Sequence, residues 1–204
     1  MPIPLTEPLL ELPRTAAELR SFIDEVRAAV QSDSDEFARG IRHEGLYKEF
    51  IDEVVPLCAF ASLAYSSDFK IQWKSGNQGH DAIVFDATGV EVDRIELARP
   101  HDGRHRSEVG DQLAAGHAAL LEASDYDKPL EHLKEFIESS AASKSHKDYS
   151  GITLVFAPVM LPPIAPLEVF FERQLDEICV LLKNYRFKAK RVVLLAPGRL
   201  LQVQ

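Results

Sequence analysis

The spacing of apolar residues changes along the chain, and each change marks a different kind of structural element. Apolar side chains recur every three to four residues over residues 15–31, which predicts a helix with one buried stripe. This segment opens with a capping box, in which the side chains of Thr15 and Glu18 each accept a hydrogen bond from the other residue's backbone amide. A second helical tract is expected over residues 36–65, with a kink or a break at Pro56.

Between residues 69 and 98 the apolar period falls to two, which is typical of strands with one face exposed to water. Apolar and polar residues alternate over residues 69–74, and apolar segments follow at 81–85 and 90–98 after short glycine-containing turns. Strands joined so closely predict an antiparallel meander.

The C-terminal half alternates helical patterns with continuous apolar runs, which belong in the covered centre of a sheet. Expected here are a short helix at 106–115, an element at 117–123 that fits either a strand or a helical turn, helices at 129–145 and 167–184, and buried strands at 152–156 and 191–195. The order of elements predicts the α/β class: a mixed sheet with an antiparallel meander, flanked by helices.

The N-terminal segment differs from the rest of the chain, because four prolines fall within its first fourteen residues. Proline fixes φ and supplies no backbone donor, so residues 1–14 are expected to form an extended arm. We therefore divide the chain into an arm with N-terminal helices at residues 1–44 and one α/β domain at residues 45–204.

Composition narrows the class of protein. The chain has 204 residues, 46% of them hydrophobic, and a formal net charge of −9, which argues against general binding to polyanions. Its two cysteines lie in apolar surroundings, as in proteins of a reducing compartment, so a cytoplasmic location is expected. No apolar run approaches the roughly 20 residues that span a bilayer, and the N-terminus lacks the pattern of a secretion signal, so no membrane association is expected.

Two carboxylates stand where burial is expected. Asp81 opens one apolar strand and Glu96 lies within the next one. A buried charge is costly unless it is paired or binds a metal, so these two acids are candidate ligands of a divalent cation. The alternative is a satisfied polar cluster, with Glu96 paired to Arg94 or Arg99 and Asp81 paired to His80.

This order of elements, with its two acids, resembles the core of the PD-(D/E)XK nuclease superfamily, the restriction-endonuclease-like fold, over residues 45–160. Asp81 matches the metal-binding aspartate of the superfamily, and Glu96 matches the first residue of its Glu-X-Lys element. Glu49 or Glu53 corresponds to an acid that some members add from the first helix. Short patterns resemble one bacterial and phage branch: Glu53-X-X-Pro56, Asp81-Ala82, Glu96-Leu97-Ala98 ahead of His101-Asp102-Gly103-Arg104, and Lys144-X-X-Lys147-X-Tyr149 before Leu154-Val155.

The chain departs from the superfamily at Ala98, which stands where the lysine of Glu-X-Lys is expected. That lysine is thought to position or activate the attacking water. Lys74, Arg94 or His80 are candidates to replace it. The resemblance implies a nuclease that hydrolyses phosphodiester bonds of DNA or RNA with Mg²⁺ or Mn²⁺. Asp81 and Glu96 would be its metal ligands and Lys74 or Arg94 would assist them.

Cations gather in three places that could contact phosphate groups. Arg99, Arg104 and Arg106 lie in the segment after the third strand, and Lys144 and Lys147 lie at the end of a predicted helix. A third basic run covers residues 183–191. Each of these has an ordinary alternative as a solvated surface, and cations in the last turn of a helix also favour its dipole without any ligand.

Two other functions stay open. One is a nuclease-like fold that has lost catalysis and serves as a binding module, which fits Ala98 and the net charge of −9. The other is an acidic protein that binds a basic partner. Nothing in the sequence decides between DNA and RNA, and association with a protein partner or with a second copy is left open.

Overall fold

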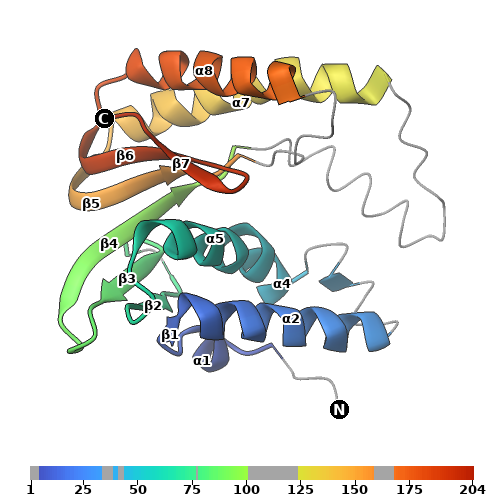
Figure 1. Cartoon of the computed structure of the whole chain (residues 1–204), viewed down its shortest axis with the longest axis vertical. Coiled ribbons are helices and arrows are strands. Elements are labelled where there is room, and N and C mark those ends of the chain that lie inside the picture. The colour runs from blue at the N-terminus through green and yellow to red at the C-terminus, as the bar shows by residue number, and fades with distance from the viewer. Residues whose placement is uncertain (1–4, 34–38, 41–43, 77, 101–123, 159–167) are drawn as a thin grey trace. The chain divides into compact units, whose positions relative to one another are not determined.

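The computed structural model describes residues 5–33, 39–40, 44–76, 78–100, 124–158 and 168–204 (Figure 1). In chain order, its elements are α1 (Glu7–Leu10), β1 (Arg14–Thr15), α2 (Ala16–Ser32), α4 (Leu46–Glu49), the π-helix η1 (Phe50–Val54), α5 (Val55–Ala64), β2 (Lys70–Trp73), β3 (Ala82–Phe85), β4 (Glu91–Ala98), α7 (Ser124–Ser145), β5 (Asp148–Phe156), α8 (Glu168–Lys183), β6 (Lys188–Ala196) and β7 (Arg199–Gln202). The predicted elements at 106–115 and 117–123 lie outside the described residues.

The strands form an open mixed sheet in the order β1-β2-β3-β4-β5-β6-β7. β2 pairs antiparallel with β1 and β3, β5 pairs parallel with β4 and β6, and β7 pairs antiparallel with β6. The α/β class predicted from the pattern of elements is therefore confirmed. By its internal contacts the chain divides into two compact units: unit 1 covers Met1–Arg94 and Gly103–Leu121, and unit 2 covers Ile95–Asp102 and Glu122–Gln204.

Helix α2 of unit 1 follows the predicted pattern closely. The Thr15 amide donates to Glu18 Oε2 at 2.8 Å and the Glu18 amide donates to Thr15 Oγ1 at 3.3 Å, so the capping box is confirmed. The buried stripe of the helix consists of Leu19, Phe22, Ile23 and Val26. This stripe gives α2 a face that packs within unit 1, where its nearest helical neighbour is α5.

The helical tract before β2 contains a π-helical turn at Phe50–Val54, directly ahead of Pro56. The Val55 amide donates to the Phe50 carbonyl, five residues earlier. Pro56 has no amide hydrogen, so the hydrogen-bond ladder is already interrupted at this point and a wider turn is tolerated. The interruption predicted at Pro56 thus takes the form of a π-helical turn followed by α5.

The expected extended arm is wrong for residues 7–10. Glu7–Leu10 form the short helix α1, with a proline in its first turn, where a missing amide hydrogen removes no intrahelical bond. Leu10 is only 1% exposed, and Arg14–Thr15 pair with β2 as β1. Burial of Leu10 and pairing with β2 are tertiary effects that proline counting does not capture.

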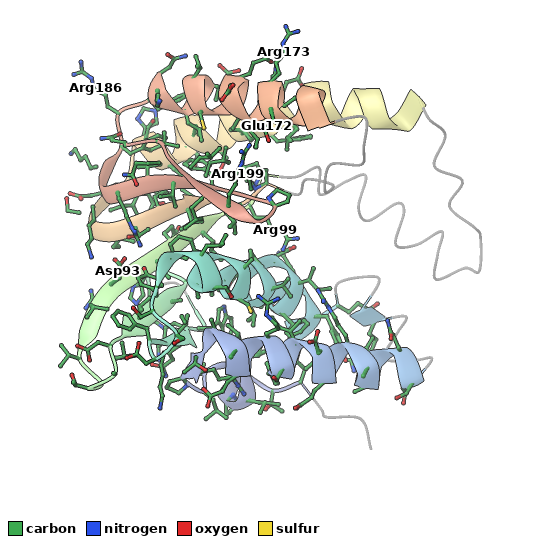
Figure 2. All side chains as sticks on the ribbon, viewed as in Figure 1. Asp93, Arg99, Glu172, Arg173, Arg186 and Arg199 are labelled. Carbon is green, nitrogen blue, oxygen red and sulfur yellow. The ribbon has the colours of Figure 1, made fainter. Side chains whose placement is uncertain are left out.

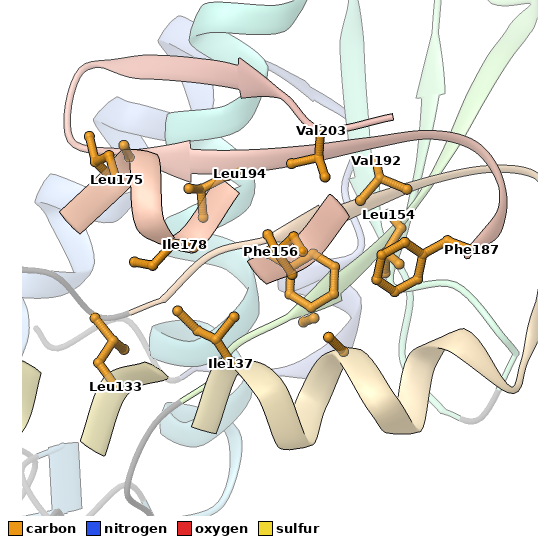
Figure 3. Close-up of a cluster of buried hydrophobic side chains, with 14 of the residues drawn as sticks. Leu133, Ile137, Leu154, Phe156, Leu175, Ile178, Phe187, Val192, Leu194 and Val203 are labelled. Atoms are coloured by element: carbon orange, nitrogen blue, oxygen red, sulfur yellow. The ribbon is translucent and has the colours of Figure 1, made fainter. Parts of the chain in front are cut away.

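Unit 2 is built around a dry hydrophobic cluster beneath α7 and α8, which lie side by side (Figure 1). Its strand residues alternate inward along β5 and β6, and its helix residues come from the apolar stripes of α7 and α8. The labelled members in Figure 3 are Leu133, Ile137, Leu154, Phe156, Leu175, Ile178, Phe187, Val192, Leu194 and Val203. The helices and strands predicted for this part of the chain are confirmed.

One strand of unit 2 is absent from the sequence-based prediction. β7 follows β6 through a tight turn in which Gly198 adopts φ 75°, and it pairs antiparallel with β6 from Val193 to Ala196. The signal was present, because Pro-Gly followed by Arg-Leu-Leu is a turn with a short apolar segment behind it. Within the described residues, no helix has both the length and the apolar character needed to cross a membrane.

Candidate functional site

Strand β4 places Glu96 by simple alternation. Asp93, Ile95 and Leu97 are buried on one side of the strand, so Glu96 and Ala98 point to the other. Ala98 is 2% exposed and belongs to the hydrophobic cluster of unit 2. Glu96 therefore lies on the same face of β4 as Ala98, two residues before it, and its side chain is 12% exposed.

Two segments of unit 2 bring polar groups to Glu96. Lys144, in the last turn of α7, donates from Nζ to Glu96 Oε1. Tyr149, in β5, donates from its hydroxyl to the same oxygen at 3.3 Å. The Lys144 Nζ also lies 5.6 Å from the centre of the Tyr149 ring. Glu96, Lys144 and Tyr149, hereafter the Glu96 cluster, thus form a compact polar group from β4, α7 and β5.

The side chains of the Glu96 cluster are largely shielded from water, and this burial affects the pKa values of Lys144 and Tyr149. Burial by itself lowers the pKa of Lys144, but the hydrogen bond and the charge of Glu96 outweigh burial, so the pKa of Lys144 is raised. Burial raises the pKa of Tyr149, and the neighbouring Lys144 only partly opposes this. At neutral pH Lys144 is consequently an ammonium ion and Tyr149 a neutral phenol.

The donors available to a metal are few. Among the described residues, no group of three His, Cys, Asp or Glu side chains is arranged to hold a metal ion. Mg²⁺ commonly takes only one or two protein carboxylates and keeps several waters. The hydrogen bonds that Glu96 accepts from Lys144 and Tyr149 both reach Oε1, so its second oxygen fits a site of that kind.

The other predicted ligand, Asp81, lies in unit 1 immediately before β3. Its side chain is half-buried, and its carbonyl accepts from the Lys74 amide at 2.9 Å. Lys74 Nζ lies 3.9 Å from Glu11 Oε2, and the other predicted helper, Arg94, donates from Nε to Glu91 Oε1 at 2.7 Å. Lys74 is thus next to Glu11, and Arg94 is paired with Glu91. The cation that contacts Glu96 is Lys144, which the sequence predicted only as a phosphate contact.

In unit 1, the half-buried Glu53 and the buried Asp93 each accept a hydrogen bond from an aromatic side chain. Glu53 Oε2 accepts from the Trp73 indole at 2.6 Å. Asp93, labelled in Figure 2, is 6% exposed and accepts from the Tyr65 hydroxyl at 2.7 Å. A signal for Asp93 existed, because it shares a strand face with Ile95 and Leu97.

Within the part of unit 1 that the structure describes, two buried atoms, Glu49 Oε2 and His80 Nε2, have no hydrogen-bond partner. Glu49 was one of two candidates for the additional helical acid, and the other, Glu53, is hydrogen-bonded to Trp73. Burial of such atoms without a partner is unfavourable, so both mark places where a water or an ion would be stabilising.

The predicted phosphate contacts have different surroundings. Arg99 is half-buried, Lys147 is exposed, and Lys144 is engaged with Glu96. Arg104 and Arg106 lie outside the described residues.

Comparisons of the chain with protein-family models, with curated proteins and with solved structures find no match.

Proposed function

We propose that this protein is a Mg²⁺- or Mn²⁺-dependent nuclease of the PD-(D/E)XK type, built on a restriction-endonuclease-like core and acting on DNA or RNA. The observation that carries the proposal is the position of Lys144, whose ammonium group lies on the Glu96 carboxylate. It supports the proposal because a carboxylate beside a lysine is the pair that the Glu-X-Lys element provides.

Packing explains why the lysine does not follow Glu96 in the sequence. Position 98 belongs to the hydrophobic cluster, where an ammonium group would be buried among apolar side chains at a large free-energy cost. The end of α7 offers an alternative point of attachment, from which Lys144 reaches Glu96 while its side chain stays 17% exposed. The charge is therefore supplied by a different element, and Ala98 fills the core.

Each residue then has a defined task. Glu96 would hold the metal through Oε2, and the resemblance to the superfamily implies Asp81 as its second carboxylate ligand. Lys144 and Tyr149 fix the orientation of Glu96 through Oε1, and the Lys144 ammonium adds positive charge where a phosphate group would bind. The metal, when bound, would polarise the phosphoryl oxygen and lower the pKa of a coordinated water.

The test is cleavage of single-stranded DNA, duplex DNA and RNA with Mg²⁺ or Mn²⁺. Glu96→Ala and Asp81→Asn are expected to abolish cleavage, because each removes a metal ligand. Glu91→Gln is the matched control: it changes an exposed acid on the same strand and should leave cleavage unchanged. Equal activity of the wild type and Glu96→Ala would refute the proposal.

A second candidate function is a nuclease-like binding module without catalysis. It is favoured by the same ion pair, since Lys144 already compensates the charge of Glu96 without a metal. Calorimetric titration with Mn²⁺ separates the two functions. Uptake that is lost in Glu96→Gln supports the nuclease, whereas no uptake by a folded wild-type protein favours the binding module.

A further inference from the structure

Charge is distributed very unevenly along this chain. Residues 178–204 contain six of the 23 basic residues and none of the 32 acidic residues, although the whole chain has a net charge of −9. This stretch covers the end of α8, the turn after it, β6 and β7. The acidic character of the protein therefore comes entirely from the remaining residues, and the C-terminal stretch is a local exception.

Arg191 and Arg199 have identified partners inside unit 2, and the exposed Lys190 also makes an interaction. Arg191 donates from Nε to the Thr153 hydroxyl at 3.0 Å, and Arg199 donates to Glu172 Oε2 at 2.6 Å. Figure 2 shows Arg199 and Glu172 close together between β7 and α8. These two arginines are explained by the fold.

The remaining exposed cations lie next to one another in the chain or in the sheet. Lys183 ends α8, Arg186 lies in the following turn with its side chain directed away from the fold (Figure 2), and Lys188 begins β6. Lys188 is in register with Asp148 of β5, so exposed Lys147 joins the same region. We call Lys147, Lys183, Arg186 and Lys188 the C-terminal basic surface.

Two acids lie near this surface. Asp148 accepts from the Ser150 amide at 2.9 Å, and this side-chain and backbone contact with Ser150, together with Lys188, lowers the pKa of Asp148. Glu138 of α7 is hydrogen-bonded to Tyr185, which lies between Lys183 and Arg186. Among the described residues, these two carboxylates do not compensate the four exposed cations. Like charges held close together on a surface are unfavourable in the free protein and are relieved when an anion binds.

We propose that the C-terminal basic surface, which adjoins the Glu96 cluster at Lys147, binds the phosphate backbone of a nucleic acid. The proposal rests on the proposed function for its choice of polyanion. A membrane is the less suitable partner, because the apolar face of α8 is used in the core of unit 2 and Phe187, within the surface, is buried. Backbone phosphates need only exposed cations, without an apolar face to insert.

The test compares two triple variants that change the net charge equally. Lys183→Gln/Arg186→Gln/Lys188→Gln removes three cations of the C-terminal basic surface. Arg27→Gln/Lys48→Gln/Lys70→Gln removes three exposed cations of unit 1. Binding of labelled single-stranded DNA and RNA is measured by fluorescence anisotropy in EDTA, so that no cleavage occurs, at about 50 to 200 mM salt.

The first variant is expected to bind about tenfold more weakly at the low-salt end and to lose about two units of the salt slope, at roughly 0.7 for each phosphate contact. The unit 1 variant should lose much less. Equal losses in both variants would show a general charge effect and overturn the proposal, as would a wild-type protein that does not bind. Loss of binding to anionic lipid vesicles, with nucleic-acid affinity unchanged, would assign the surface to a membrane instead.

The same assay separates this inference from the proposed nuclease activity. Glu96→Ala should bind nucleic acid in EDTA as tightly as the wild type, because the C-terminal basic surface is intact. A protein that cleaves nucleic acid but keeps its affinity in the first triple variant refutes the binding surface alone. A protein that binds through the surface but never cleaves refutes the nuclease alone.

Discussion

Unit 1 and unit 2 each contain a half-buried glutamate, and the two glutamates accept hydrogen bonds from different kinds of donor. In unit 1, Glu53 accepts a short hydrogen bond of 2.6 Å from the neutral indole of Trp73. In unit 2, Glu96 accepts from the charged ammonium group of Lys144 and from the hydroxyl of Tyr149. The first arrangement joins a helix to a strand by a neutral donor, and the second joins α7 to β4 by an ion pair.

The difference matters for both stability and chemistry. A neutral donor can be deleted at the cost of one hydrogen bond and its desolvation, whereas deleting the cation of a buried pair leaves a charge uncompensated. An ammonium group beside a carboxylate also controls the carboxylate's orientation. The pair in unit 2 is therefore the better candidate for function, and the contact in unit 1 is the better candidate for a structural joint.

The largest effect should come from Lys144→Met, which keeps the length of the side chain but removes its charge. We expect the free energy of unfolding to fall by about 2 to 3 kcal/mol. This is at or below the lower end of the range for breaking a buried ion pair, because both side chains keep some exposure to water. Urea denaturation measures the loss. The double variant Glu96→Gln/Lys144→Met should recover part of it, and a double variant that is as unstable as the sum of the single changes would contradict coupling between the two residues.

A smaller loss is expected for Trp73→Phe, which keeps an aromatic ring in β2 and removes the indole donor to Glu53. The expected decrease in the free energy of unfolding is about 1 to 2 kcal/mol. The control is Glu53→Gln/Trp73→Phe, in which the charge is also gone and the penalty should shrink. If Trp73→Phe were more damaging than Lys144→Met, the contrast between the two units would be reversed.

The smallest effect should appear at high pH. The pKa of Lys144 is raised in the folded protein, so its stabilising contribution is fully present below its unfolded pKa of about 10.4 and is lost as the pH rises through the higher folded value. The raised pKa of Tyr149 acts in the same direction, from about pH 10 upward. Denaturation curves at pH 8 and above pH 10 should show a steeper loss for the wild type than for Lys144→Met, and parallel losses would exclude this contribution.

Much of the fold could be predicted because the local signals agree with one another. The capping box of Thr15 and Glu18, the alternation in β4 and the apolar runs of β5 and β6 each act over a few residues. Predictions were weaker where distant contacts decide the outcome. Leu10 is buried by the rest of unit 1, and the pairing of β7 with β6 requires a turn that is stable only when the partner strand is present.

The residues of the candidate site also differ in whether local signals or distant contacts determine their positions. Glu96 could be singled out from the sequence because a charge inside an apolar strand is unusual, and its face followed from alternation. Its partner could not, because Lys144 is 48 residues further along the chain and local spacing does not report which helix end meets which strand. The sequence instead directed attention to cations near Glu96, and of these Arg94 pairs with Glu91.

The sequence by itself determined the α/β class, the start of α2 and the presence of Glu96 in β4, because periodicity and capping are properties of neighbouring residues. Only the tertiary structure decided that Lys144 and Tyr149 would meet that carboxylate and that Ala98 would fill the core. The physical reason is that burial, which makes a charge costly and a partner necessary, is created by packing between segments that are far apart in the chain.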